Sequence, residues 1–148
     1  MQVKINNGYL LSQNTINHFV VGDVLLSATV GNMVGLLELK VYCDKHNKTK
    51  MKVYNFNKKD QSLITIGRCG CSINVDNANV AQVHCSVYFN KYTNCWCVVD
   101  GDGKGHKSGI GVWVIVKEGQ RFKFENKSKW EYLVKIGMQM FSVYFDNT

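Results

Sequence analysis

Residues 64–86 read ITIGRCGCSINVDNANVAQVHCS, and this stretch decides the fold. An alternating apolar run ends in the pair Gly67-Arg68, a second run covers residues 72–75, and a third begins near His84. Short apolar runs separated by polar turns predict strand, loop, strand, loop, strand. Arg68 stands out because the chain is rich in lysine and its only other arginine is Arg121. A guanidinium on a loop can hold a phosphate or carboxylate through two hydrogen bonds.

The rest of the chain shows the same kind of short runs, with turn residues between them and no helical spacing. Residues 35–43 alternate between apolar and polar side chains, which is typical of a half-buried strand, and residues 44–50 form a charged hairpin loop. Further strands are predicted at residues 51–56, 84–90, 94–99, 112–116, 121–125, 130–136 and 139–145. Many short strands with turn signals predict an all-β fold, an antiparallel β-sandwich of two packed sheets.

Residues 1–34 contain three shorter apolar runs, at 8–11, 16–21 and 24–30, the last two separated by a Gly-Asp turn. We expect them to form N-terminal strands that pack on a main domain of residues 35–148. A glycine-rich loop over residues 100–111 is longer than most hairpin connections, which makes it a candidate functional loop.

Composition narrows the environment. The net charge is +7, which suits an anionic partner, although the lysines are dispersed along the chain. Six cysteines are present, but the first residues do not look like a signal peptide and no apolar run approaches about 18 residues. We therefore expect reduced thiols in an intracellular protein, cytoplasmic or nuclear, with no membrane contact.

The stretch 64–86 and the segment that follows it resemble the signature of the forkhead-associated (FHA) domain, a reader of phosphothreonine peptides. That signature runs Gly-Arg, a Cys-Asp-Ile-like strand and Ser-x-x-His, then Trp, a hydrophobic residue, Asp and a Ser-x-Asn-Gly-Thr loop. The matching residues here are Gly67, Arg68, Cys71, Ile73, His84, Trp96, Val98, Asp100, Ser108 and Gly111. The similarity covers about residues 35–145.

The resemblance implies a role for each matching loop residue. Arg68 and Ser108 would contact a phosphate, and Lys107 from the long loop is a further candidate for this contact. His84 would support the loops by hydrogen bonding without touching the phosphate, while Gly67 and Gly111 would serve as scaffold. The implied partner is a protein, with or without phosphothreonine, and the implied function is that of a scaffold for protein binding.

Four positions depart from the family pattern. The serine of Ser-x-x-His is Ala81, the basic residue that often follows it is Gln82, and the threonine and asparagine of the second loop are Gly109 and Ile110. Each lost hydrogen bond to a charged group costs ~1.5–3 kcal/mol. We therefore expect phospho-independent or weakened binding, with Ile110 making an apolar contact to a protein partner. The alternative is a working phosphothreonine reader that depends on Arg68.

Other classes of function find little support. Cys69-x-Cys71 and Cys95-x-Cys97 are spaced more tightly than zinc ligands usually are, and on a strand such pairs only share a face. Strand alternation also points His84 away from its neighbour Cys85, which disfavours a Cys-His nucleophile. We expect no metal, no cofactor and no enzyme activity.

A nucleic-acid-binding domain is the second alternative. It would need lysines and aromatic rings interleaved on one face, and residues 52–59, KVYNFNKK, are the only stretch that fits. We do not expect nucleic acid to be the partner.

Overall fold

The computed structural model describes residues 1–6, 8–33, 35–42, 51–124 and 131–144. Within these ranges the chain forms thirteen strands joined by turns and loops. They are β1 (Gln2–Lys4), β2 (Tyr9–Leu10), β3 (Ile16–Val21), β4 (Val24–Val30), β5 (Leu36–Tyr42), β6 (Met51–Asn57), β7 (Leu63–Gly67), β8 (Ile73–Asn74), β9 (Cys85–Asn90), β10 (Cys95–Asp100), β11 (Val112–Ile115), β12 (Glu131–Ile136) and β13 (Gln139–Tyr144).

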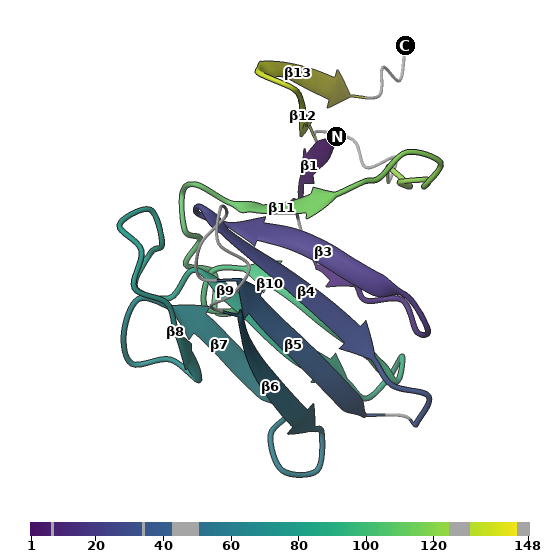
Figure 1. Ribbon diagram of the computed structural model, residues 1–148, viewed down its shortest axis with the longest axis vertical. Helices are drawn as coiled ribbons and strands as arrows, with labels where there is room; N and C mark the ends of the chain where they lie inside the picture. The colour runs from purple at the N-terminus through teal and green to yellow at the C-terminus, as the bar shows by residue number, and fades with distance from the viewer. Residues whose placement is uncertain (7, 34, 43–50, 125–130, 145–148) are drawn as a thin grey trace.

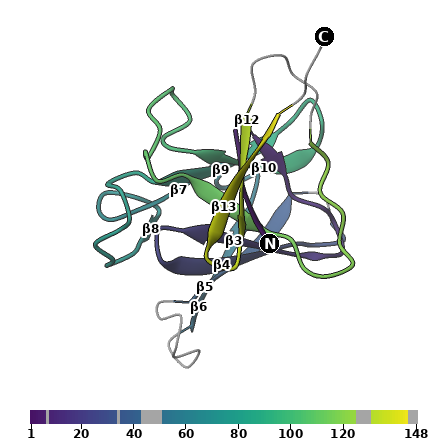
Figure 2. The same ribbon diagram turned by 90° about the horizontal axis from the view of Figure 1, so that it is seen from above.

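The strands build two sheets that face each other as separate layers (Figures 1 and 2). One sheet has eight strands in the order β13-β12-β1-β11-β3-β4-β5-β6, and the other has five in the order β2-β10-β9-β7-β8. The named strand pairs are antiparallel except for β7 and β8, which run parallel. The predicted all-β sandwich is confirmed.

The main core lies between the two sheets and follows from the alternation of side chains along the strands. In β5, Leu37, Leu39 and Val41 are buried while the residues between them are partly exposed. Ile64 and Ile66 of β7 fill the opposite layer. This period-two burial is what the sequence pattern of half-buried strands predicts.

A smaller second core lies where the eight-stranded sheet extends past its partner. Its buried members are Val3, Val116, Tyr132 and Val134, with the rings of the segment after β11 packed against them. In Figure 1, β12 and β13 stand above the region in which the two sheets overlap. The end of the sheet is thus covered by a chain segment and not by a second layer of strands.

Two details of the strand prediction need comment. Residues 121–124 were expected to be part of a strand, and this is wrong, since they have no regular structure. The short strand β1 was not expected, yet it pairs with both β11 and β12. Cys43, the hairpin loop at 44–50, Glu125, Trp130 and Phe145 lie outside the described residues.

The proposed boundary after residue 34 falls between β4 and β5, which are hydrogen-bonded neighbours with Ser27 opposite Lys40. Residues 1–34 supply β1, β3 and β4 to the large sheet and β2 to the small one. Nowhere in the described ranges is there a helix long and apolar enough to cross a membrane.

Candidate binding site at the loop end of the sandwich

Three loops meet at one end of the sandwich, on the left of Figure 1. They are residues 68–72 after β7, residues 76–84 before β9 and residues 101–111 after β10. We call these three segments the loop end. A chain of hydrogen bonds links them, and nearly all the residues singled out in the sequence belong to it.

The first link joins the Gly67-Arg68 pair to the second loop. The backbone N–H of Arg68 donates to the carbonyl oxygens of Ala81 (3.0 Å) and Gln82 (3.1 Å). A Cβ atom on Gly67 would lie only 2.1 Å from the Gln82 oxygen, so the two backbones approach this closely only because position 67 has no side chain. The Arg68 side chain that follows is exposed to solvent.

The second link runs through His84, whose ring is fully buried. The backbone N–H of Ala81 donates to Nδ1 at 3.0 Å, so Nδ1 is the acceptor nitrogen. The proton therefore sits on Nε2, which donates to the Gly111 carbonyl at 2.8 Å. One neutral imidazole thus ties the second loop to the third through both of its nitrogens.

The start of the third loop is fastened to β9. The N–H of Gly101 donates to the His84 carbonyl at 2.7 Å, and the buried Ser86 hydroxyl donates to the Gly101 carbonyl at 2.8 Å. Both polar backbone groups of Gly101 are therefore satisfied inside the protein, as buried groups require.

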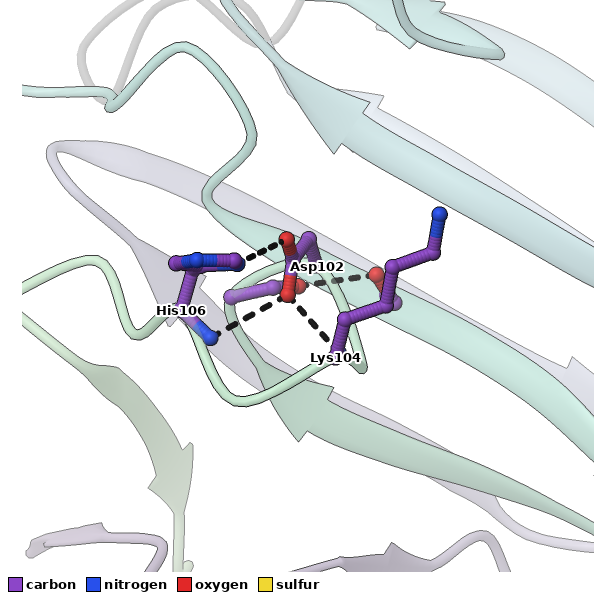
Figure 3. Close-up of polar contacts among 5 residues, drawn as sticks. Asp102, Lys104 and His106 are labelled. Atoms are coloured by element: carbon purple, nitrogen blue, oxygen red, sulfur yellow. Dashed lines mark hydrogen bonds and ion pairs between the residues drawn. The ribbon is translucent and has the colours of Figure 1, made fainter.

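Asp102 orders the tip of the same loop (Figure 3). Its Oδ1 accepts the N–H groups of Lys104 (2.7 Å) and His106 (3.2 Å), and its Oδ2 lies 2.7 Å from Nδ1 of His106. The hydrogen bond from the Lys104 N–H, followed by those from His106, lowers the pKa of Asp102. The carboxylate is thus occupied by groups of its own loop.

The two candidate phosphate contacts on the third loop are also engaged. Oγ of Ser108 accepts the N–H of Gly111 at 2.8 Å, and the Ser108 N–H donates to Oδ1 of Asp100 at 3.2 Å. Nζ of Lys107 donates to the Asn6 carbonyl at 3.3 Å, in the connection after β1. Ser108 is thereby joined to the loop network, while the Lys107 ammonium reaches toward β1.

The positions that depart from the family pattern lie in the same place. Ala81 and Gln82 contact the Arg68 backbone, as described above. Gly109 has φ 85° with open space around it, and the side chain of Ile110 is 48% exposed. The carbonyl of Ile110 accepts Nε1–H of Trp113 at 3.1 Å. The side chains of Arg68 and Ile110 are therefore exposed at the loop end, together with the cationic tip of the third loop.

The turn between β3 and β4 supports the second loop from behind. Nδ2 of Asn79 donates to a carboxylate oxygen of Asp23 in that turn. This contact links the N-terminal strands to the loop end. No motif in the sequence pointed to it, because the two residues lie 56 positions apart.

The cysteines are not gathered at one place. Cys69 and Cys71 follow the Gly67 end of β7, whereas Cys97 is opposite Tyr88, which pairs with Leu63 at the other end of β7. The five cysteines in the described ranges are free, and those ranges hold no cluster of three or more His, Cys, Asp or Glu side chains able to bind a metal.

Two of these thiols bear on the nucleophile question. Burial raises the pKa of Cys85 far above its ordinary value, and burial also raises the pKa of Cys71. Both shifts disfavour the thiolate, which is the reactive form of cysteine.

The stretch at residues 52–59 lies on β6 and the turn after it. Tyr54 and Phe56 point inward and pack against the main core, and Nζ of Lys58 lies 4.7 Å from the centre of the Phe89 ring. The two rings thus lie on the core side of β6, away from the outer surface on which bases would stack.

Comparison with known proteins gives no further evidence on this site. No protein-family model matches the chain, and neither a curated protein nor a solved structure matches it. The proposals below therefore rest on the contacts of this chain.

Proposed function

We propose that the chain is a forkhead-associated-like protein-interaction module whose loop end binds a protein partner with little or no dependence on phosphate. The observation that carries this proposal is the setting of Arg68. Its backbone is hydrogen-bonded to the second loop at Ala81 and Gln82, while its side chain is exposed and Ala81 stands where the resembling family has a serine.

The geometry of Ser108 supports the same proposal. Its oxygen already accepts the Gly111 N–H, which leaves the hydroxyl proton as its one donor. Arg68 and this hydroxyl would then be the main groups facing a phosphate. Ala81 and Gly109 replace two residues that would each donate a hydrogen bond to the phosphate. The loss of two such bonds, at ~1.5–3 kcal/mol each, would weaken phosphopeptide binding by about two to four powers of ten.

Ile110 is the side chain expected to contact the protein partner. A large apolar side chain about half exposed on a fixed loop is suited to a partner that brings an apolar surface of its own. The loop is fixed because buried hydrogen bonds of His84 and Ser86 hold both of its ends. A preordered loop loses little conformational entropy on binding.

Affinity capture tests the proposal when it is run on lysates with and without phosphatase treatment. We compare the wild type with Ile110→Ser and Arg68→Ala, and quantify the same captured proteins in each arm. Ile110→Ser is expected to reduce capture several-fold, whereas phosphatase treatment leaves capture nearly unchanged. Capture that disappears after phosphatase treatment and in Arg68→Ala would instead establish the working phosphothreonine reader.

A gain-of-function variant sharpens this test. Ala81→Ser with Ile110→Asn restores two polar side chains at the loop end, and we expect the variant to bind phosphothreonine peptides about tenfold more tightly or better. Gly109 is left unchanged because its φ of 85° disfavours a β-branched threonine. Isothermal titration of a phosphothreonine peptide library against both forms measures the gain. No gain would mean that these positions do not converge on the Arg68 side chain.

A further inference from the structure

A second arginine lies in a groove at the other end of β11. Two adjoining hollows of about 310 and 210 Å³ share the residues Tyr9, Ser12, Arg121 and Phe122. They run between residues 5–18 and the segment that follows β11, which Figure 1 shows on the right, opposite the loop end. We call these two hollows the aromatic groove.

The charge of the groove has one sign. Arg121 and Lys123 line the larger hollow, and the described lining residues of both hollows include no aspartate or glutamate. Nζ of Lys117 lies 3.1 Å from Nε2 of His18 at the edge of the smaller hollow. Within the described part of the chain Arg121 forms no ion pair. Its guanidinium is therefore free to meet an anion.

The wall shared by the hollows is aromatic. The rings of Tyr9 and Phe122 are parallel within 3°, with centres 6.1 Å apart. Phe122 is fixed from behind by edge contacts to Phe124 (5.1 Å) and Tyr132 (6.3 Å). Tyr9 and Phe122 are only partly buried, so aromatic surface remains exposed inside a cationic groove.

We propose that the aromatic groove binds a nucleoside phosphate, with the base against the aromatic wall and the phosphate held by Arg121 and Lys123. The larger hollow is of the size of the smallest ligand sites in proteins. Asn6, Ser12 and Gln120 also line the hollows. Nδ2 of Asn6 donates to the Glu131 carbonyl and Oε1 of Gln120 accepts the Lys117 N–H, so the other polar groups of these side chains are the ones suited to base edges or sugar hydroxyls.

Stacking and charge together identify the ligand class. An aromatic surface beside cations is the arrangement by which proteins hold single-stranded nucleic acid, since every base has a flat face and every nucleotide a phosphate. Burial raises the pKa of Tyr9, so its hydroxyl stays protonated and adds a neutral donor to the site. The ligand is either a free mononucleotide or one nucleotide of a single strand.

The test titrates the whole chain with AMP, UMP, adenosine, inorganic phosphate and a fluorescein-labelled single-stranded oligonucleotide at low salt. We expect AMP or UMP to bind more tightly than adenosine or phosphate alone. Arg121→Ala is expected to weaken nucleotide binding about tenfold, and Phe122→Leu to weaken it about as much. Lys91→Ala, which removes an exposed charge in the turn between β9 and β10 and outside the groove lining, is the matched control and should leave affinity unchanged.

The outcomes separate the two sources and the rival explanations. Binding of the oligonucleotide alone, lost in Arg121→Ala, assigns the groove to single strands, and binding of AMP or UMP assigns it to free nucleotides. The proposal would be overturned by an equal loss in Lys91→Ala, by phosphate binding as tight as AMP binding, or by no binding of any probe. Because Phe122 packs on the second core, its variant is checked by thermal melting, and Arg121→Ala with an exposed side chain carries the test if Phe122→Leu is unfolded.

Discussion

The two arginines of this chain lie at opposite ends of β11, and they are positioned in different ways. Arg68 follows a glycine pressed against another backbone and stands beside a buried histidine that joins two loops. Arg121 stands on a segment without regular structure, where aromatic rings pack against one another. The loop end is held by hydrogen bonds between backbone groups and the buried side chains of His84 and Ser86, and the groove by ring packing.

This difference predicts how each region tolerates change. Removing a buried hydrogen-bonding side chain at the loop end leaves backbone groups without partners, so stability suffers before any surface property does. An exposed cation in the groove contributes little to folding, so its replacement affects binding alone. Substitutions that separate stability from binding therefore test whether the two ends differ as described.

The largest effect is expected for His84→Ala. The change leaves the Ala81 N–H and the Gly111 carbonyl without their partner and opens a cavity where a fully buried ring stood. The expected loss is about 3–5 kcal/mol of unfolding free energy. Urea denaturation followed by tryptophan fluorescence measures it.

The matched control is His106→Ala, since the side chain of His106 is 84% exposed and contacts only its own loop. We expect this variant to change stability by less than about 0.5 kcal/mol. If both variants were equally stable, the loops would not depend on the buried imidazole and the contrast between the two ends would fail.

Gly67→Ala is expected to be the next most damaging change. The new Cβ atom would lie 2.1 Å from the Gln82 carbonyl oxygen, so the backbone of one loop must move, at a cost of about 2–3 kcal/mol. Gly109→Ala is the comparison, because that position has open space and only its φ of 85° to disfavour a side chain, about 1 kcal/mol. Thermal melting measures both variants. A lower melting temperature for Gly109→Ala than for Gly67→Ala would disprove the close approach at Gly67.

The sequence predicted the parts of the molecule that depend on local pattern. Alternation at residues 35–43 predicted β5, and the hairpin partner expected at residues 51–56 is β6. The apolar runs around Gly67-Arg68 predicted β7, the short β8 and β9. Alternation fails as a guide at residues 121–124, because Phe122 and Phe124 turn to an aromatic cluster while their charged neighbours stay in water. Such one-sided burial produces a period of two without any partner strand.

Long-range features could not be predicted at all. The three residues of β1 are too few to show a period, and their place between β11 and β12 is decided by pairing across more than a hundred positions. The aromatic groove is likewise lined by residues from the ranges 5–18 and 114–123 and by Tyr132 of β12. Of the residues in the groove, only Arg121 stood out in the sequence, because it is the one arginine besides Arg68.

The smallest effects concern pH, and they separate the two ends once more. Burial, and after it the charge of Lys117, lowers the pKa of His18 below its ordinary value of 6.5. The unfolded chain therefore takes up this proton first, and stability falls as the pH drops below about 6.5 toward the lowered pKa. At the loop end, the lowered pKa of Asp102 means that its contribution is present above the ordinary value of 3.8 and is lost only in more acidic solution.

An NMR titration of the histidine rings checks the groove half of this contrast. Lys117→Met removes the cation that lies 3.1 Å from Nε2 of His18, so the pKa of His18 should rise while remaining below 6.5, since burial is the larger cause. Lys104→Met removes the same charge at the tip of the third loop, outside the groove lining, and should leave the pKa of His18 unchanged. The variant keeps the loop intact, because Lys104 contacts Asp102 through its backbone N–H. A His18 that titrates at or above 6.5 in the wild type would show that its ring is solvated. The groove would then lack the enclosed edge that the Lys117 contact gives it.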